Sequence, residues 1–341
     1  MDTHRFITSA LRIIISVAVR IISVIPWLLL ARPVFSSRDR ALDYRAALNP
    51  DDLRQHVATV TAEFFPRSHD HPDNLDRLAT HIASTLRATG ARVWEQVYPV
   101  NGIPYRNVIA EYGPENQPVV VVGAHYDAHG PEPAADDNAS GVAGLLELGR
   151  LLTDQPLGRR VILAAYTLEE PPYFATEHMG SAVHANALAA AGTAVELMIS
   201  LEMIGYFSDA PGSQDYPNQL MAWLYPPTGN FIAIVDEFFS MQARRMKKSM
   251  RRAIDLPVHS VNAPASVPGV DFSDHRNFWH HGYPAVMVTD TAFMRNQAYH
   301  TPEDTADRLD YEKMAQVVYG VYQHVLQLAR KDRVDGRSGV R

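Results

Sequence analysis

The 341-residue sequence contains no cysteine. Disulfide bonds and thiolate metal sites are therefore excluded, which leaves histidine, aspartate and glutamate as the possible metal ligands. An excess of positive charge is also missing, because 38 acidic residues outnumber 31 lysines and arginines and give a net charge of −7. An acidic chain has no general attraction to nucleic acid, so we expect no nucleic-acid partner.

Long hydrophobic runs are scarce, and one stands near the N-terminus. It extends for 19 residues from Ile13 to Ala31 and contains a single charge, Arg20. As a helix it would rise ~28 Å, about the thickness of the hydrocarbon core of a bilayer. Arginines before and within the run favour a cytoplasmic N-terminus.

Two interpretations of residues 1–35 remain open. They form a signal anchor that holds the protein to a membrane through residues 13–31, or a signal peptide whose cleavage gives a secreted protein. No A-x-A-like cleavage site follows Ala31, which favours the anchor. Both interpretations place the rest of the chain outside the cytoplasm, in the periplasm or the extracellular space.

Helical and strand patterns alternate after a polar linker at residues 36–52. The segment 118–124, PVVVVGA, is a continuous apolar run, which is typical of a strand buried on both faces. Strands are predicted at 92–100, 105–112, 118–124, 160–167, 196–201 and 284–289, an apolar segment at 230–235, and helices at 75–86, 140–152, 238–254 and 311–330. The alternation predicts one α/β domain over residues 53–335, with a largely parallel central sheet flanked by helices.

Polar side chains follow three of the predicted buried strands. They are His125 and Asp127, the pair Glu169 and Glu170, and Glu202. In an open α/β sheet, ligands bind at the carboxyl ends of the strands, so these residues predict a site at one edge of the sheet. A further acidic set, 136–141, begins the helix after the first of these strands, and His300 precedes a predicted helix start.

Six short stretches carry a resemblance to a known family. They are GAHYDA (123–128), DDNASG (136–141), LEE (168–170), LEMIGY (201–206), SDHRNFW (273–279) and YHTPEDT (299–305). In this order they resemble the co-catalytic di-zinc aminopeptidases of bacterial type, whose relatives include glutamate carboxypeptidase, transferrin receptor and glutaminyl cyclase. The resemblance covers the chain from about Leu53 onward and implies a three-layer sandwich with helices on both faces of the sheet.

The resemblance also implies two Zn²⁺ per chain and a role for each matching residue. Asp137 would bridge the two ions, with His125 and Glu202 completing one site and Glu170 and His300 the other. Asp127 would orient the His125 imidazole from behind. The chain departs from the simplest pattern at Glu202, where aspartate is usual and glutamate is one methylene longer.

Glu169 would act as the general base in the same comparison. A metal-activated hydroxide would attack the peptide, and Glu169 would pass its proton to the leaving amine. Three carboxylates and one hydroxide balance the four charges of two zinc ions, so the centre can be buried. Because successive strand residues face opposite sides, Glu169 and Glu170 can share the site only if their strand has already ended. Tyr299 is a candidate hydrogen-bond donor to the oxyanion.

These features predict a zinc-dependent exopeptidase that hydrolyses N-terminal residues from peptides with a free N-terminus. Two alternatives remain: an enzyme similar to glutaminyl cyclase with one zinc, and a non-catalytic receptor or scaffold ectodomain of the same fold. Dipeptidase or carboxypeptidase action on the same metals also stays open. The sequence determines neither the oligomeric state nor the preferred N-terminal residue, although loops at about 206–227 and 258–271 are expected to line the pocket.

A cluster of basic residues lies in the predicted helix at 238–254. Its members are Arg244, Arg245, Lys247, Lys248, Arg251 and Arg252. At 100° per residue they share one arc of about 160°, opposite Ala243, Met246, Met250 and Ala253. The pattern predicts a solvated outer helix face, and the alternative is contact with anionic lipid headgroups.

Overall fold

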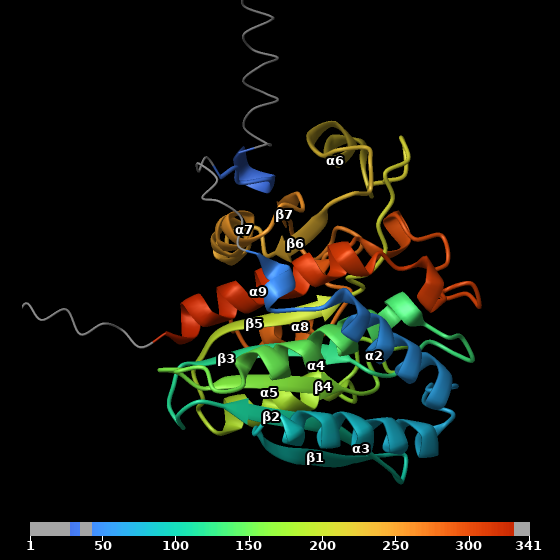
Figure 1. The fold of residues 1–341 in the computed structure, drawn as a ribbon, viewed down its shortest axis with the longest axis vertical. Helices are drawn as coiled ribbons and strands as arrows, with labels where there is room; N and C mark the ends of the chain where they lie inside the picture. Colours follow the sequence, from blue (N-terminus) through green and yellow to red (C-terminus); the bar gives the residue numbers. More distant parts are fainter. Residues whose placement is uncertain (1–27, 35–42, 331–341) are drawn as a thin grey trace, which may run out of the picture.

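An eight-stranded mixed sheet forms the centre of the molecule in a computed structural model, which describes residues 28–34 and 43–330 (Figure 1). The strand order is β1-β2-β4-β3-β5-β8-β6-β7. The strands are β1 (Arg92–Val100), β2 (Ile103–Tyr112), β3 (Val119–His125), β4 (Val161–Tyr166), β5 (Val195–Glu202), β6 (Ile232–Asp236), β7 (Val258–Asn262) and β8 (Ala285–Thr289). The pairs β3–β4, β3–β5, β5–β8 and β6–β7 are parallel, which confirms the predicted largely parallel sheet.

Helices cover both faces of this sheet. One face packs against α3 (Pro72–Ala88), α4 (Gly141–Leu152), α7 (Gln242–Ala253) and α9 (Tyr311–Ala329), and α2 (Pro50–Glu63) packs on α4 and α9 on the same side. The other face packs against α5 (Gly180–Ala190) and α8 (His275–His280). The short helix α6 (Gln219–Leu224) lies beyond the β6–β7 edge of the sheet (Figure 1). The three predicted layers are therefore present.

The core explains why the apolar patterns in the sequence are so regular. Every residue of β3 is buried, as expected of a central strand with helices on both sides. The predicted inner stripes of α3 and α9 are buried as well, and their members are Leu75, Leu78, Ile82, Leu86, Met314, Val317, Val318, Val321 and Val325.

Among the differences from the sequence-based prediction, two concern the predicted linker and a predicted loop. Helix α2 begins at Pro50, with the Asn49 side chain accepting a hydrogen bond from the Asp51 backbone N–H, so the last three residues of the predicted linker 36–52 are helical. Strand β7 occupies the start of the segment 258–271, which was predicted to be a loop. Its five residues, VHSVN, mix polar and apolar side chains over too short a length to show a strand period.

The predicted N-terminal apolar helix lies largely outside the described residues, which begin at Leu28. Within residues 28–34 and 43–330, no helix combines the length and apolarity needed to cross a bilayer. The membrane anchor therefore stays a prediction.

One residue of the cationic arc predicted to face solvent on α7, Lys247, is buried instead. Its side chain is only 4% exposed, and its ammonium group donates a hydrogen bond of 2.6 Å to the Ser260 hydroxyl on β7. Lys247 lies at the edge of the arc, next to the apolar positions Ala243 and Met250, so a modest helix rotation turns it inward. The other five cations stay on the outer side of the helix, half-buried or exposed.

Candidate metal centre

The five predicted metal ligands converge at the carboxyl ends of the parallel strands. His125 is the last residue of β3 and Glu202 the last residue of β5, while Glu170 follows the end of β4. Asp137 lies in the turn before α4, and His300 in the loop that follows β8. Segments up to 175 positions apart in sequence thus meet because parallel strands end at the same edge.

Asp137 is shared between two groups of side chains. Its Oδ1 lies 3.3 Å from His125 Nε2, and its Oδ2 lies 3.0 Å from His300 Nε2. Glu202 Oε2 is 3.4 Å from His125 Nε2, and Glu170 Oε2 is 3.3 Å from His300 Nε2. The result is two adjacent triads that share Asp137, His125–Asp137–Glu202 and Asp137–Glu170–His300, each compact enough to hold one metal ion. A third group, His125, Glu169 and Glu170, is equally compact and does not include Asp137.

Glu169 and Glu170 take different positions at this centre. Strand β4 ends at Tyr166, and Leu168 has a left-handed backbone with φ 59°, so the alternation of a strand no longer applies. Both carboxylates can therefore face the same cluster. Glu170 points to His300, while Glu169 Oε2 stays 4.0 Å from His125 Nε2. This separation is what distinct roles for the two glutamates require.

Asp127 stabilises the turn that carries these two glutamates. Its Oδ1 and Oδ2 accept hydrogen bonds of 3.2 Å and 3.1 Å from the backbone N–H groups of Glu169 and Glu170. His125 Nδ1 lies 3.2 Å from the Asp127 backbone oxygen and 3.6 Å from its carboxylate. Both the backbone oxygen and the carboxylate of Asp127 therefore lie beside the imidazole, and the predicted orienting role of the carboxylate stays a prediction.

Two residues that the sequence-based prediction missed fix the turn around Asp137. The Asp304 carboxylate accepts hydrogen bonds from the backbone N–H groups of Asp136 and Asp137, at 3.0 Å each. Asn138 bridges to the end of β5, donating to the Leu201 oxygen and accepting from the Met203 N–H. The peptide bond between Asp137 and Asn138 is cis. Asp304 belongs to the YHTPEDT stretch, so that motif could have identified Asp304 as a residue of the site.

Ser273 is a third missed residue, and it bears on the unusual glutamate at position 202. Its hydroxyl donates a hydrogen bond of 2.7 Å to Glu202 Oε2. A buried carboxylate on a longer side chain gains a fixed orientation from such a bond. Ser273 is the first residue of the SDHRNFW stretch, so this motif could have identified it as a residue of the site.

Aromatic rings enclose His300 from both sides. The Tyr299 ring stacks on it with centroids 3.7 Å apart, and the His129 ring stacks on the other side at 4.0 Å. This packing limits rotation of the imidazole and leaves its Nε2 aimed at Asp137 and Glu170. Tyr299 is thus next to the cluster, as predicted, although its role as a donor stays a prediction.

The pKa values of the cluster reflect close packing of like charges in a buried site. Burial, and then the Asp137 charge, raise the pKa of Glu170 to about 8. Burial raises the pKa of Glu169 well above its usual range, and that of Glu202 in the same direction. For His300, burial alone would lower the pKa, but the Asp137 and Glu170 carboxylates outweigh it and raise it to about 10.

Three buried polar atoms in this centre have no hydrogen-bond partner among the described residues. They are His125 Nε2, Glu170 Oε1 and His300 Nε2. Orphaned buried polar atoms are costly, and here all three are metal-ligand atoms from side chains that point at one another. The donor set of two imidazoles and three carboxylates suits Zn²⁺, so the residues fit the metal that the family resemblance implies.

The metal-free protein is expected to lose stability as pH rises from 5 to 9. Glu170 ordinarily titrates near 4.5 and here near 8, so between these values the folded state binds more protons than the unfolded chain. His300 acts in the same direction, because the stability it gains as a cation is lost as pH rises through about 10. Thermal melting in a chelator across this range should show a falling Tm, and a rising Tm would contradict the assignment.

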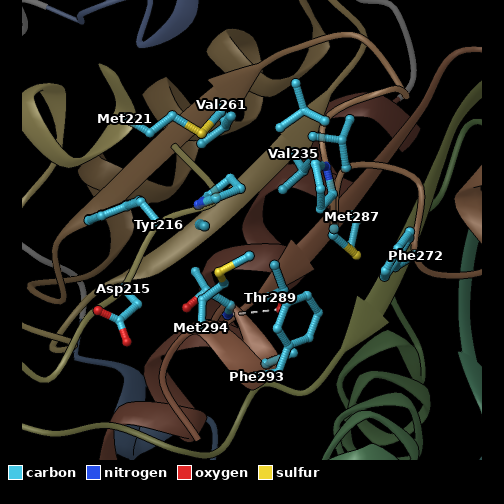
Figure 2. Close-up of a pocket in the computed structure, with 18 of the residues that line it drawn as sticks. Asp215, Tyr216, Met221, Val235, Val261, Phe272, Met287, Thr289, Phe293 and Met294 are labelled. Atoms are coloured by element: carbon cyan, nitrogen blue, oxygen red, sulfur yellow. Dashed lines mark hydrogen bonds between the residues drawn. The ribbon is translucent and has the colours of Figure 1, made fainter. Parts of the chain in front are cut away.

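An apolar cavity opens beside the metal cluster. It lies on the side of β6, β7 and β8 opposite α7, where α6 and two loops form the cover. Its interior volume is about 100 Å³. Figure 2 shows Met221, Val261 and Met287 lining it. Glu202 and Tyr299 also line it, so the cavity and the metal cluster are contiguous.

Comparisons with known proteins identify a family and several relatives of this chain. Residues 107–325 match the family described as Peptidase family M28. The chain is 51% identical over 282 residues to the uncharacterized protein YfbL of Escherichia coli (strain K12), covering 80% of this chain and 86% of that protein. It is 28% identical over 222 residues to leucine aminopeptidase 1 of Uncinocarpus reesii (strain UAMH 1704), covering 62% of this chain and 51% of that enzyme.

Solved structures show the same fold at low sequence identity. BSAP, a zinc aminopeptidase from Bacillus subtilis, matches with a TM-score of 0.67 and 14% identity, covering 84% of this chain and 96% of that chain. Glutaminyl cyclase from Porphyromonas gingivalis matches with a TM-score of 0.63 and 20% identity, covering 83% and 99%. At these identities, both matches show a shared fold, and the chemistry of the site is argued from its own residues.

Proposed function

The chain belongs to peptidase family M28, and from this premise we propose that it is a two-zinc exopeptidase that releases N-terminal residues from peptides. The observation that carries the proposal is the pair of triads sharing Asp137, with orphaned ligand atoms on His125, Glu170 and His300. The similarity to leucine aminopeptidase 1 supports action at the N-terminus.

Each triad would hold one zinc ion, with Asp137 between them. Bound zinc supplies the positive charge that lowers the pKa of a water molecule and polarises a carbonyl oxygen. Ser273 keeps the Glu202 carboxylate in place, and Asp127 keeps both Glu169 and Glu170 in their turn. The chain's own hydrogen bonds therefore set the ligand positions before any ion binds.

Glu169 is the candidate proton carrier. It is buried at the cluster without being a member of either triad that shares Asp137, and burial raises the pKa of its carboxyl group. A carboxylate placed beside the cluster can accept a proton from water and release it to a leaving amine. Tyr299, stacked on His300, would donate a hydrogen bond to the developing oxyanion.

The direct test combines zinc content with a substrate panel. The purified full-length protein is expected to hold two zinc ions and to cleave aminoacyl substrates with a free N-terminus but not their N-blocked forms. One tightly held ion with cyclisation of N-terminal glutamine would favour the glutaminyl-cyclase alternative. Two bound ions without turnover of any substrate would favour the non-catalytic ectodomain.

The cavity supports a preference for large apolar N-terminal side chains. Its walls include Met287, Phe293 and Met294 (Figure 2). Because the predicted loops 206–227 and 258–271 contribute much of this wall, the cavity is the candidate site for the first side chain of the substrate. An apolar pocket discriminates by about tenfold or more for each methylene that fails to fit.

Replacing Ala233, which lines the cavity from β6, by leucine is expected to shorten the pocket. The value of kcat/KM for leucyl and phenylalanyl substrates should fall about tenfold or more, while that for alanyl substrates stays nearly unchanged. Ala187→Leu on the exposed side of α5 is the matched control and should leave both unchanged. Equal losses for all three substrates would argue against the cavity as the side-chain pocket.

A further inference from the structure

The most exposed aromatic side chains of the described chain lie at one end of the molecule. Phe239 is 88% exposed and Trp223 is 77% exposed, and smaller exposed fractions belong to their apolar neighbours Leu28, Leu29, Leu220 and Met241. In Figure 1 this end holds α6, α7 and the segment 28–34, while β1 and α3 lie at the opposite end. Solvent-facing rings of this kind have no role in the core or in the metal centre.

The segment 28–34 joins these elements into one continuous surface. The Arg32 guanidinium donates hydrogen bonds to the backbone oxygens of Phe238 and Ser240, in the turn before α7. A cleft beside it is lined by Leu28, Leu29, Arg32, Pro33, Met241 and Arg244. A second cleft, which also includes Pro33, extends from the end of α6 to Lys247 and Arg251 on α7.

A row of cations runs along α7 from the exposed Met241. Arg245, Lys248 and Arg252 are three and four positions apart, so they form one exposed stripe along α7. Within residues 28–34 and 43–330, none of the three lies within ion-pair distance of a carboxylate. Arg251 is also exposed and donates to the Val34 backbone oxygen at 3.2 Å. This stripe stands out on a chain whose net charge is −7.

We propose that the α6–α7 face, defined as residues 28–34, α6, the turn 238–241 and α7, rests on the surface of an anionic lipid bilayer. Exposed aromatic side chains together with exposed lysines and arginines suit the boundary between headgroups and acyl chains. The charge of the stripe is complementary to that of anionic lipids. The sequence agrees, because the apolar run from Ile13 ends on this face at Ala31.

This surface goes beyond the peptidase function, since none of the five candidate metal ligands belongs to the face, and only Met221 of α6 also lines the cavity among the residues of the face that the structure describes. Contact through the face would hold the catalytic domain at the bilayer in one orientation. Two other occupants compete for the same apolar residues: residues 1–27 of this chain and a second copy of the protein. The test below treats both as outcomes.

The absence of cysteine makes a single-site reporter possible. Phe239→Cys in the full-length chain is labelled with a polarity-sensitive fluorophore and measured with phosphatidylcholine vesicles, with and without 25% phosphatidylglycerol. We expect a blue shift and a several-fold intensity gain on the anionic vesicles, with quenching by spin-labelled lipid. Val97→Cys on β1, where valine is 61% exposed, is the matched control and should not respond.

Removing the stripe tests the charge contribution. In the Phe239→Cys background, R245Q/K248Q/R252Q should abolish the difference between anionic and neutral vesicles, while Tm and peptidase activity stay at the level of the labelled parent. Three outcomes overturn the proposal: no response at position 239, an equal response at 97, or a blue shift already present without vesicles. The last would assign the face to residues 1–27, or to a second copy if it weakens on dilution.

Discussion

The variant Glu169→Gln is expected to lower kcat by about a hundred- to ten-thousand-fold while keeping both zinc ions. Glutamine has nearly the shape of glutamate but cannot accept and release the proton that hydrolysis transfers. Glu169 Oε2 is 4.0 Å from His125 Nε2, and the triads that share Asp137 do not include it, so metal binding should survive. Steady-state kinetics with zinc analysis of the same preparation provide both measurements.

The control for this variant is Glu303→Gln, which neutralises an exposed carboxylate near His300 in the sequence. It should keep normal turnover, which would show that a lost charge alone is not the cause. A Glu169→Gln protein with nearly normal turnover would remove Glu169 from the mechanism. A variant that loses zinc along with activity would instead make Glu169 a ligand, as its proximity to His125 and Glu170 permits.

Removal of the metal should have the second large effect. Chelation is expected to abolish activity and lower Tm by about 10 °C, because an ion present at a thousand times its Kd stabilises the folded state by about 4 kcal/mol. The loss should be larger at pH 8 than at pH 6, since zinc binding requires deprotonated ligands and the pKa of Glu170 is raised to about 8. Added zinc should restore both activity and Tm.

Asp137→Asn tests the shared ligand in the same way. It should reduce zinc content at both sites, because Asp137 directs one oxygen towards each histidine. Asp154→Asn is the matched control: this residue is exposed and has φ 58°, a conformation that asparagine tolerates. For the chelation experiment on the unmodified protein, activity that persists after exhaustive chelation would contradict the zinc hypothesis. A variant at position 137 that loses one ion only would show that the residue does not bridge.

The sequence predicted the regular parts of the fold because their signals are local. A continuous apolar run predicts strand β3, and apolar residues at helical spacing predict α9. Strand β7 was not predicted from the sequence, because five residues of mixed polarity show no strand period. The burial of Lys247 was not predicted either. A residue at the edge of a helical arc can face solvent or protein, and only the contact of Lys247 with β7 decides which.

By itself, the sequence determined the α/β class, the order of the motifs and the identity of the candidate ligands, since each depends on residue type and on neighbours along the chain. Only the tertiary structure decided that Asp137 faces both histidines and that an apolar cavity adjoins the centre. It alone also decided that Ser273 holds the Glu202 carboxylate and that Asp304 holds the turn at Asp137. Those facts depend on distances between segments far apart in the chain, which the packing of strands and helices sets and no local pattern encodes.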